Sequence, residues 1–235
     1  MSDTREKAQG VRRRRKVMAV ASAGLALGLA AVLSLAAWND SEWVFGGLGP
    51  GGGGDEGVGT SEFEVQQNAW EGATAPTTAS SFTDHETNPG NALLFDVDPT
   101  GLTPGTTIYA PVALTTTAES VAGTLTLTTP AVAANGKTAD DPDGLLWDNL
   151  IYSVRVTDDA ATAANCQTDF ASAGTAIVTD SAFSDSVTTG TQSLSAARGN
   201  VQYYCFAITL PDNATTQTLQ GLKVFPAWRF HATSS

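Results

Sequence analysis

The histidines of this 235-residue chain limit its possible chemistry, because there are only two, His85 and His231. No His-Glu-x-x-His sequence is present, so the paired imidazoles that a zinc hydrolase uses are missing. A Gly-x-Ser-x-Gly sequence is also missing, and two histidines leave few general bases for a serine nucleophile. Asp84 and Glu86 flank His85, but one imidazole between two acids is typical of a solvated turn. We therefore predict no catalytic residues and no enzyme activity.

The two cysteines, Cys166 and Cys205, offer a second kind of chemistry. In an exported chain an even number of cysteines indicates a disulfide. A closed loop of about forty residues would contribute roughly 3–4 kcal/mol to stability, provided that its geometry is unstrained. Two free buried thiols are the alternative. A metal site would need further Cys or His ligands nearby, and the sequence offers none, so we predict no metal.

Clustered carboxylates present a third kind of chemistry, because carboxylate oxygens are ligands that Ca²⁺ prefers. Asp96 and Asp98 form one cluster, and residues 140–144 (Asp-Asp-Pro-Asp-Gly) form another. The second cluster resembles part of an EF-hand loop but lacks the glutamate that completes it. Aspartates that serve turn geometry and solubility are the favoured reading. We predict no cofactor and keep Ca²⁺ as the weaker alternative.

The residues that would position these groups have a β pattern. Segments rich in Val, Ile, Thr, Tyr and Phe alternate with turn clusters, and the sequence shows no amphipathic helix of about twelve residues or more. The expected strands are 62–68, 91–97, 106–116, 121–129, 149–157, 175–180, 202–210 and 221–232, and residues 159–164 could form a short helical turn. Strands at this spacing predict an all-β fold, a two-sheet sandwich of Ig-like or jelly-roll type.

The start of the chain has the composition of an export signal. Residues 12–16 (Arg-Arg-Arg-Arg-Lys) precede an uncharged apolar segment that ends in the small residues Ala36 and Ala37. This order of basic, apolar and small residues predicts a signal peptide over residues 1–36, with an n-region at 1–16, a hydrophobic region at 17–36 and cleavage between Ala36 and Ala37 or one residue later. A retained anchor helix is the alternative, because about twenty residues can cross a membrane.

A short arm follows the signal. Residues 37–60 contain the aromatic residues Trp38, Trp43 and Phe45 and then a glycine-rich run over 46–59. Such a run predicts a flexible linker, so the aromatic segment would be tethered loosely to a β domain at 61–235. The exposed aromatic surface of this segment is expected to pack on its own domain, on another subunit or on a partner.

The signal and two further short motifs carry a resemblance to a known group of proteins. The run Ala37-Trp38-Asn39-Asp40 after an Ala/Gly/Leu-rich core resembles the signal region of proteins matured by the SipW-type signal peptidase. That group includes the TasA and camelysin (CalY) biofilm-fibre proteins. The Leu-Thr-Pro-Gly turn at 102–105 resembles their Leu-x-Pro-Gly turn, and residues 227–234 resemble the last strand of actinobacterial members.

This resemblance implies a secreted subunit of bacterial fibres whose N-terminal segment adds as a strand to the sheet of the next subunit. Trp38, Trp43 and Phe45 would then anchor the donor segment. The long glycine run of this chain departs from TasA, and a role of the linker as a spacer is therefore the alternative. Camelysins are reputed metallopeptidases, but this sequence lacks the paired histidines for that activity.

Charge constrains the partners. Seven of the twelve Lys and Arg residues and two of the twenty-four Asp and Glu residues precede Ala37, which leaves 22 acids, 5 bases and a net charge of −17 in the remainder. Such a surface disfavours nucleic acid and anionic lipid as partners. Membrane contact would be limited to the signal or anchor helix.

Two main functions follow as hypotheses. The first is a secreted or cell-surface fibre subunit of a bacterial matrix, with itself, other matrix proteins and a signal peptidase as partners. The second is a monomeric surface adhesin or binding module held by an uncleaved helix at 17–37. The identity of the mature N-terminus distinguishes them, and a camelysin-like metallopeptidase is a less favoured third reading.

Overall fold

The computed structural model describes residues 60–134, 137–214 and 216–235. The expected signal with its boundary at Ala36 and Ala37, and the arm with Trp38, Trp43 and Phe45, lie outside the described residues. Residues 60–235 form one compact unit. Within the described residues, no helix combines the length and the apolar character needed to cross a membrane.

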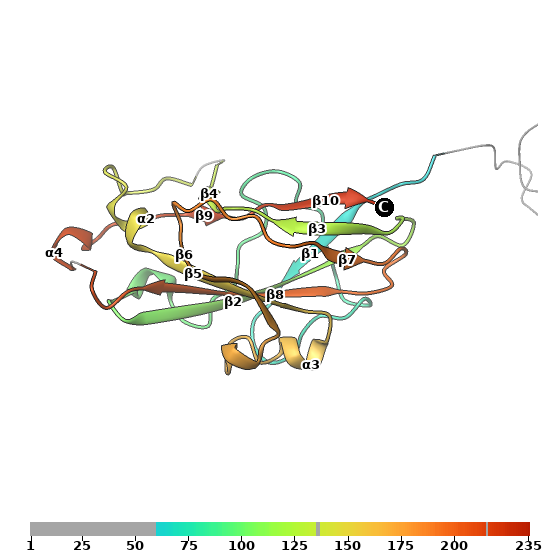
Figure 1. Cartoon of the computed structure of the whole chain (residues 1–235), viewed down its shortest axis with the longest axis horizontal. Helices are drawn as coiled ribbons and strands as arrows, with labels where there is room; N and C mark the ends of the chain where they lie inside the picture. Colours follow the sequence, from blue (N-terminus) through green and yellow to red (C-terminus); the bar gives the residue numbers. More distant parts are fainter. Residues whose placement is uncertain (1–59, 135–136, 215) are drawn as a thin grey trace, which may run out of the picture. The chain divides into compact units, whose positions relative to one another are not determined.

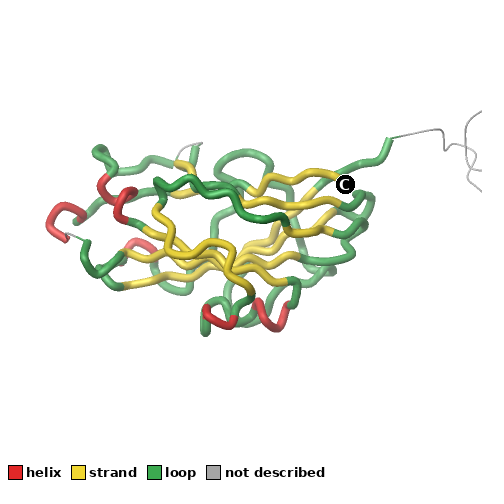
Figure 2. The backbone as a smooth tube through the Cα atoms, viewed as in Figure 1, coloured by secondary structure: helices red, strands yellow, loops and turns green. Residues whose placement is uncertain are grey.

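Antiparallel β-sheet dominates the described part of the chain, so the all-β prediction is confirmed at that level (Figure 2). The largest sheet has five strands, in the pairing order β1 (Val65–Ala69), β2 (Thr106–Thr116), β8 (Gln202–Leu210), β5 (Ile151–Thr157) and β6 (Thr175–Ala182). A second sheet pairs β10 (Phe230–Ser234), β3 (Gly123–Leu127) and β7 (Gln192–Leu194), and a small ribbon pairs β4 (Ala131–Val132) with β9 (Pro226–Ala227).

In the described residues, helical structure is limited to short turns. These are α2 (Leu145–Asn149), α3 (Ala160–Ala163), α4 (Thr216–Leu219) and the 3₁₀ turns η1 (Pro99–Gly101) and η2 (Phe170–Ser172). The expected turn at 159–164 is confirmed as α3, which Asp159 caps by accepting the Thr162 backbone N–H at 2.7 Å. Figure 1 shows the three-stranded sheet on one side of the five-stranded sheet and α3 on the other.

Strand β8 occupies the centre of the five-stranded sheet and is buried on both faces. Its alternate side chains Tyr204, Phe206 and Ile208 join a core to which the three-stranded sheet contributes Leu125 and Leu127. The intervening side chains point to the α3 side, where Tyr203 packs with Trp70, Phe82 and Ala163. A strand with apolar side chains on both faces needs a covering layer on each side, which explains its nearly continuous apolar sequence.

An aromatic cluster fills the core on the side of the three-stranded sheet. Trp228 has ring centroids 5.8 Å from Tyr152, 5.8 Å from Phe183 and 4.8 Å from Phe206. Phe230 continues the cluster, with its centroid 4.6 Å from that of Tyr204. Tilted and edge-on aromatic pairs of this kind add about 0.5–1.5 kcal/mol each to the free energy gained by burial alone. Trp228 and Phe230 therefore anchor the C-terminal segment in the core, in addition to the pairing of β10 with β3.

Most of the strand predictions are confirmed, but the prediction for residues 91–97 is wrong. That segment makes only one backbone hydrogen bond to β2, from Asp96 N–H to Tyr109 O at 3.0 Å. The Tyr109 N–H instead donates to the Asp96 carboxylate at 2.8 Å, so a side chain replaces the next bond of a ladder. The expected strand at 221–232 is also divided, into β9 and β10, and the short strands β4 and β7 were not predicted.

Candidate functional site

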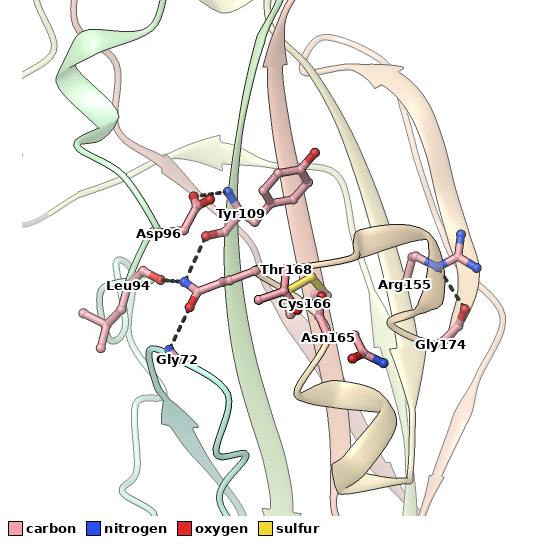
Figure 3. Close-up of a disulfide and its surroundings, with 11 residues drawn as sticks. Gly72, Leu94, Asp96, Tyr109, Arg155, Asn165, Cys166, Thr168 and Gly174 are labelled. Atoms are coloured by element: carbon pink, nitrogen blue, oxygen red, sulfur yellow. Dashed lines mark hydrogen bonds between the residues drawn. A yellow bond between two sulfur atoms is a disulfide. The ribbon is translucent and has the colours of Figure 1, made fainter.

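The disulfide is the one predicted site that the structure places fully, and it joins Cys166, which follows α3, to Cys205 in the middle of β8. The Cα atoms are 5.5 Å apart, and both cysteines are at most 3% exposed. The side chain of the next residue, Gln167, donates to Leu94 O and Tyr109 O and accepts the Gly72 N–H. Figure 3 draws these three bonds as dashed lines that end at the labelled residues Leu94, Tyr109 and Gly72. The disulfide therefore fastens the segment after α3 to β8, and the Gln167 hydrogen bonds connect that segment to Gly72, to Leu94 and to β2.

The two histidines lie on different parts of the body. His85 follows β1 and makes a 3.0 Å hydrogen bond with the hydroxyl of Thr83, while His231 is an exposed residue of β10. Among residues 60–134, 137–214 and 216–235, no group of three or more His, Cys, Asp or Glu side chains could hold a metal ion. Nothing in the described geometry assigns either imidazole a catalytic role.

The aspartates considered as calcium ligands have structural partners. Asp141 accepts the backbone N–H groups of Leu146 and Trp147, at 3.2 and 2.9 Å, and so caps the first turn of α2. The Asp98 carboxylate accepts the backbone N–H and the hydroxyl of Thr100, and these hydrogen bonds lower its pKa. Both carboxylates thus stabilise turns, which is the role that we expected for the aspartates of the acidic clusters.

Sheet edges are the remaining candidates, because an edge strand offers unpaired backbone N–H and C=O groups to an added strand. Three of the four edges of the two larger sheets are blunted. At β1, Gln67 exchanges two backbone hydrogen bonds with Thr83, at 2.9 and 3.0 Å. At β6, the ladder is irregular and Asp180 has a positive φ of 44°.

The third blunted edge is β7, which has only three residues. Its Ser193 carbonyl accepts hydrogen bonds from the side chains of Asn200 and Gln202, both at 3.0 Å. Side chains of the body therefore occupy the position that an added strand would need. A short edge whose backbone groups are already satisfied is a poor template for strand addition.

Strand β10 is different, because it is a regular edge of five residues with no bulge in its pairing with β3. The Arg229 carbonyl accepts from Thr128 N–H, and Ser235 N–H donates to Ala122 O. In an antiparallel pair, hydrogen-bonded positions alternate with non-bonded ones. The backbone groups of residues 231 and 233 therefore face β3, and those of Phe230, Ala232 and Ser234 face away from it.

The outward backbone groups of β10 form a template for a further strand. Phe230 and Ala232 are half-buried against the core, while His231, Thr233 and Ser234 are exposed. An added strand would therefore continue a sheet that has one apolar face and one polar face. Sequence reasoning expected a strand here but did not single out Phe230 and Ala232, since which edge is open depends on how the strands pair.

No known family model matches the chain, and no curated protein matches it.

Proposed function

We propose that the chain is an exported structural subunit of bacterial cell-surface or biofilm-matrix fibres. In this proposal the body is a two-sheet sandwich, and residues 37–45 of one copy add as a strand to the β10 edge of the next copy. The observation that carries the proposal is the regular edge of β10, which no other strand of the described residues pairs with on its outer side, beside three edges that are blunted. Head-to-tail strand addition does not close on itself, so it generates a filament.

The chemistry of the proposed donor is compatible with such an edge. In an extended strand, Trp43 and Phe45 would share one face, with Trp38 on the other. Each large aromatic ring that becomes buried removes about 150–250 Å² from water, which at roughly 25 cal/mol per Å² corresponds to about 4–6 kcal/mol before ordering costs. Backbone hydrogen bonds to β10 would fix the register of the added strand.

The proposal includes export and processing. The basic, apolar and small residues at the start of the chain support cleavage near Ala36 and Ala37, and the resemblance to SipW-processed proteins supports maturation by a dedicated signal peptidase. A disulfide in the body is compatible with an oxidising compartment. The proposed function is structural, without catalysis or a resident cofactor.

The experiment combines N-terminal sequencing of the exported protein with removal of the donor anchors. We expect a mature chain that begins at Ala37 or Trp38 and forms filaments under the electron microscope. The triple variant Trp38→Ser, Trp43→Ser, Phe45→Ser should fold and stay monomeric, while Asn39→Ser, Ser41→Ala should polymerise as the parent does. A retained hydrophobic segment on a monomer at the membrane would instead favour the adhesin, and filaments from the triple variant would refute strand donation.

A further inference from the structure

The outward face of the C-terminal segment carries a row of basic and aromatic residues. Alternate residues Leu222, Val224, Trp228, Phe230 and Ala232 pack against the core. The intervening side chains Lys223, Phe225, Arg229 and His231 therefore lie on the opposite face, along β9, β10 and the residues just before them. Lys137 joins this row from a neighbouring segment, and we call these five residues the basic stripe.

The stripe contains the cations whose charged groups make no hydrogen bond to the body, although Asp140 lies opposite Lys223 and exchanges two backbone hydrogen bonds with it, at 2.8 and 3.0 Å. Of the five Lys and Arg residues after residue 60, Arg155 donates to Gly174 O at 2.9 Å and Arg198 donates to the Gln66 side chain at 2.8 Å. The other three are exposed on the stripe, where the ammonium groups of Lys137 and Lys223 lie 5.9 and 5.4 Å from the centre of the Phe225 ring. In the part of the chain that the structure describes, no acid forms an ion pair with them.

Acidic side chains gather on another part of the body, around the start of β1. Glu62 and Glu64 precede β1, and the paired backbone hydrogen bonds between Gln67 and Thr83 bring Asp84 and Glu86 beside this segment. The pKa of Glu64 is raised first by desolvation and then by the negative charge of Asp84 and a side-chain hydrogen bond with it, with further contributions from Glu62 and Glu86. These four residues form the acidic cluster. Crowding of like charge is unfavourable, and a cation from outside would relieve it.

We propose that the basic stripe of one copy binds the acidic cluster of another copy, as a second contact between subunits in addition to strand addition at the β10 edge. The contact rests on the proposed function, because polymerisation is what brings the copies together. Two features favour a second copy as the occupant: it supplies both charged surfaces, and neither is neutralised by ion pairs within the described part of its own chain. The stripe uses side chains on the face of β10, so it leaves the outward backbone groups of Phe230 and Ala232 available.

Complementary charge reversal in the full exported chain tests the contact. Variant A carries Lys223→Glu and Arg229→Glu, and variant B carries Glu62→Lys and Glu86→Lys. Variant A presents two negative surfaces, and variant B leaves its cluster with no net charge opposite a positive stripe, so either variant alone should assemble roughly tenfold more slowly than the parent at low salt. An equimolar mixture of A and B restores opposite charges wherever the stripe of B meets the cluster of A, and it should therefore assemble faster than either variant alone.

A net-charge control separates this contact from general repulsion. Glu71→Lys with Asp158→Lys changes the net charge as variant B does, at exposed positions outside the cluster, and should assemble like the parent or faster. Near 1 M NaCl, where the screening length falls to about 3 Å, the difference between the parent and variant A should disappear. Circular dichroism and thermal melts would establish that every variant is folded.

The outcomes separate this inference from the proposed function. Filaments that form from variant A at the parent rate, or a mixture that fails to recover, would overturn the charge contact and leave strand addition intact. If the triple variant of Trp38, Trp43 and Phe45 polymerised, the strand-addition proposal would be refuted, whatever the charge-reversal variants show. Stripe-dependent binding of polyglutamate by a parent protein whose copies do not associate would identify a soluble polyanion as the partner and overturn the contact between copies.

Discussion

Removal of the disulfide is expected to lower the stability of the body by an amount that follows from its place in the chain. Cys166 and Cys205 are separated by 39 residues, so the bond constrains a long loop in the unfolded chain. The chain-entropy relation gives about 4 kcal/mol for a loop of this size. For a domain of this length, 1 kcal/mol corresponds to roughly 2–4 °C in the melting temperature, so we expect a fall of about 8–16 °C.

The variant Cys166→Ala, Cys205→Ala, measured by scanning calorimetry, tests this value. Alanine avoids burying a hydroxyl at two positions that are at most 3% exposed. A matched control is Ser184→Ala, which changes an exposed residue between the two cysteines and leaves the bond intact. Hydrogen exchange should also show earlier opening of α3 and η2, since the bond fastens these turns to β8. A melting temperature within about 2 °C of the parent would refute the loop argument.

Three further predictions concern single side chains. Burial, with a smaller effect from Asp185, raises the pKa of Tyr152 to about 12. The pKa of Tyr152 is higher in the folded than in the unfolded chain, so its contribution to stability is complete below pH 10 and is lost as the pH rises towards 12. The variant Tyr152→Phe has no such group, and it should therefore lose less stability than the parent in alkaline melts. At pH 7 the free energy of unfolding of this variant should equal that of the parent or exceed it by up to about 1 kcal/mol, because the buried hydroxyl has no hydrogen-bond partner within the described structure. A decrease of more than about 2 kcal/mol would contradict this. Phe206→Ala should cost about 3–5 kcal/mol in urea unfolding because it opens a cavity beside Trp228, and a cost below 1 kcal/mol would show that the cluster does not pack as described. Asp141→Ala should lower the free energy of unfolding by about 1–2 kcal/mol, because α2 loses its cap. Addition of Ca²⁺ should leave the melting temperature of the parent unchanged, and a calcium-dependent rise would instead support a calcium site at this turn.

Local sequence pattern was sufficient for the longest strands. The bounds of β2 and β8 agree with the expected 106–116 and 202–210, because both are long apolar runs that end at turn residues. The pattern at 91–97 was equally apolar, but the Asp96 side chain takes the Tyr109 N–H that a ladder would have used. Strands as short as β4 and β7 depend on their partners and leave little signal of their own.

The candidate site was predictable only in part. The pairing of Cys166 with Cys205 followed from an even count of cysteines in a chain with an export signal, and the structure confirms it. The open edge at β10 depends on remote contacts that blunt the other edges, such as the bonds between Gln67 and Thr83. The basic stripe has a period of two in the sequence, but which of the two faces is exposed depends on the packing of Trp228 and Phe230 in the core.

Proline substitution at Ala232 is the most direct test of strand addition at the β10 edge. The Ala232 N–H faces away from β3, so its removal should leave the β3 ladder intact and take a hydrogen bond only from an added strand. Ala232→Val keeps the N–H and is the matched control. We predict that exported Ala232→Pro protein folds, with its disulfide formed, and stays monomeric in seeded assembly assays, while Ala232→Val assembles. Filaments of Ala232→Pro protein that grow at the parent rate would contradict the proposal that this edge receives the donor strand.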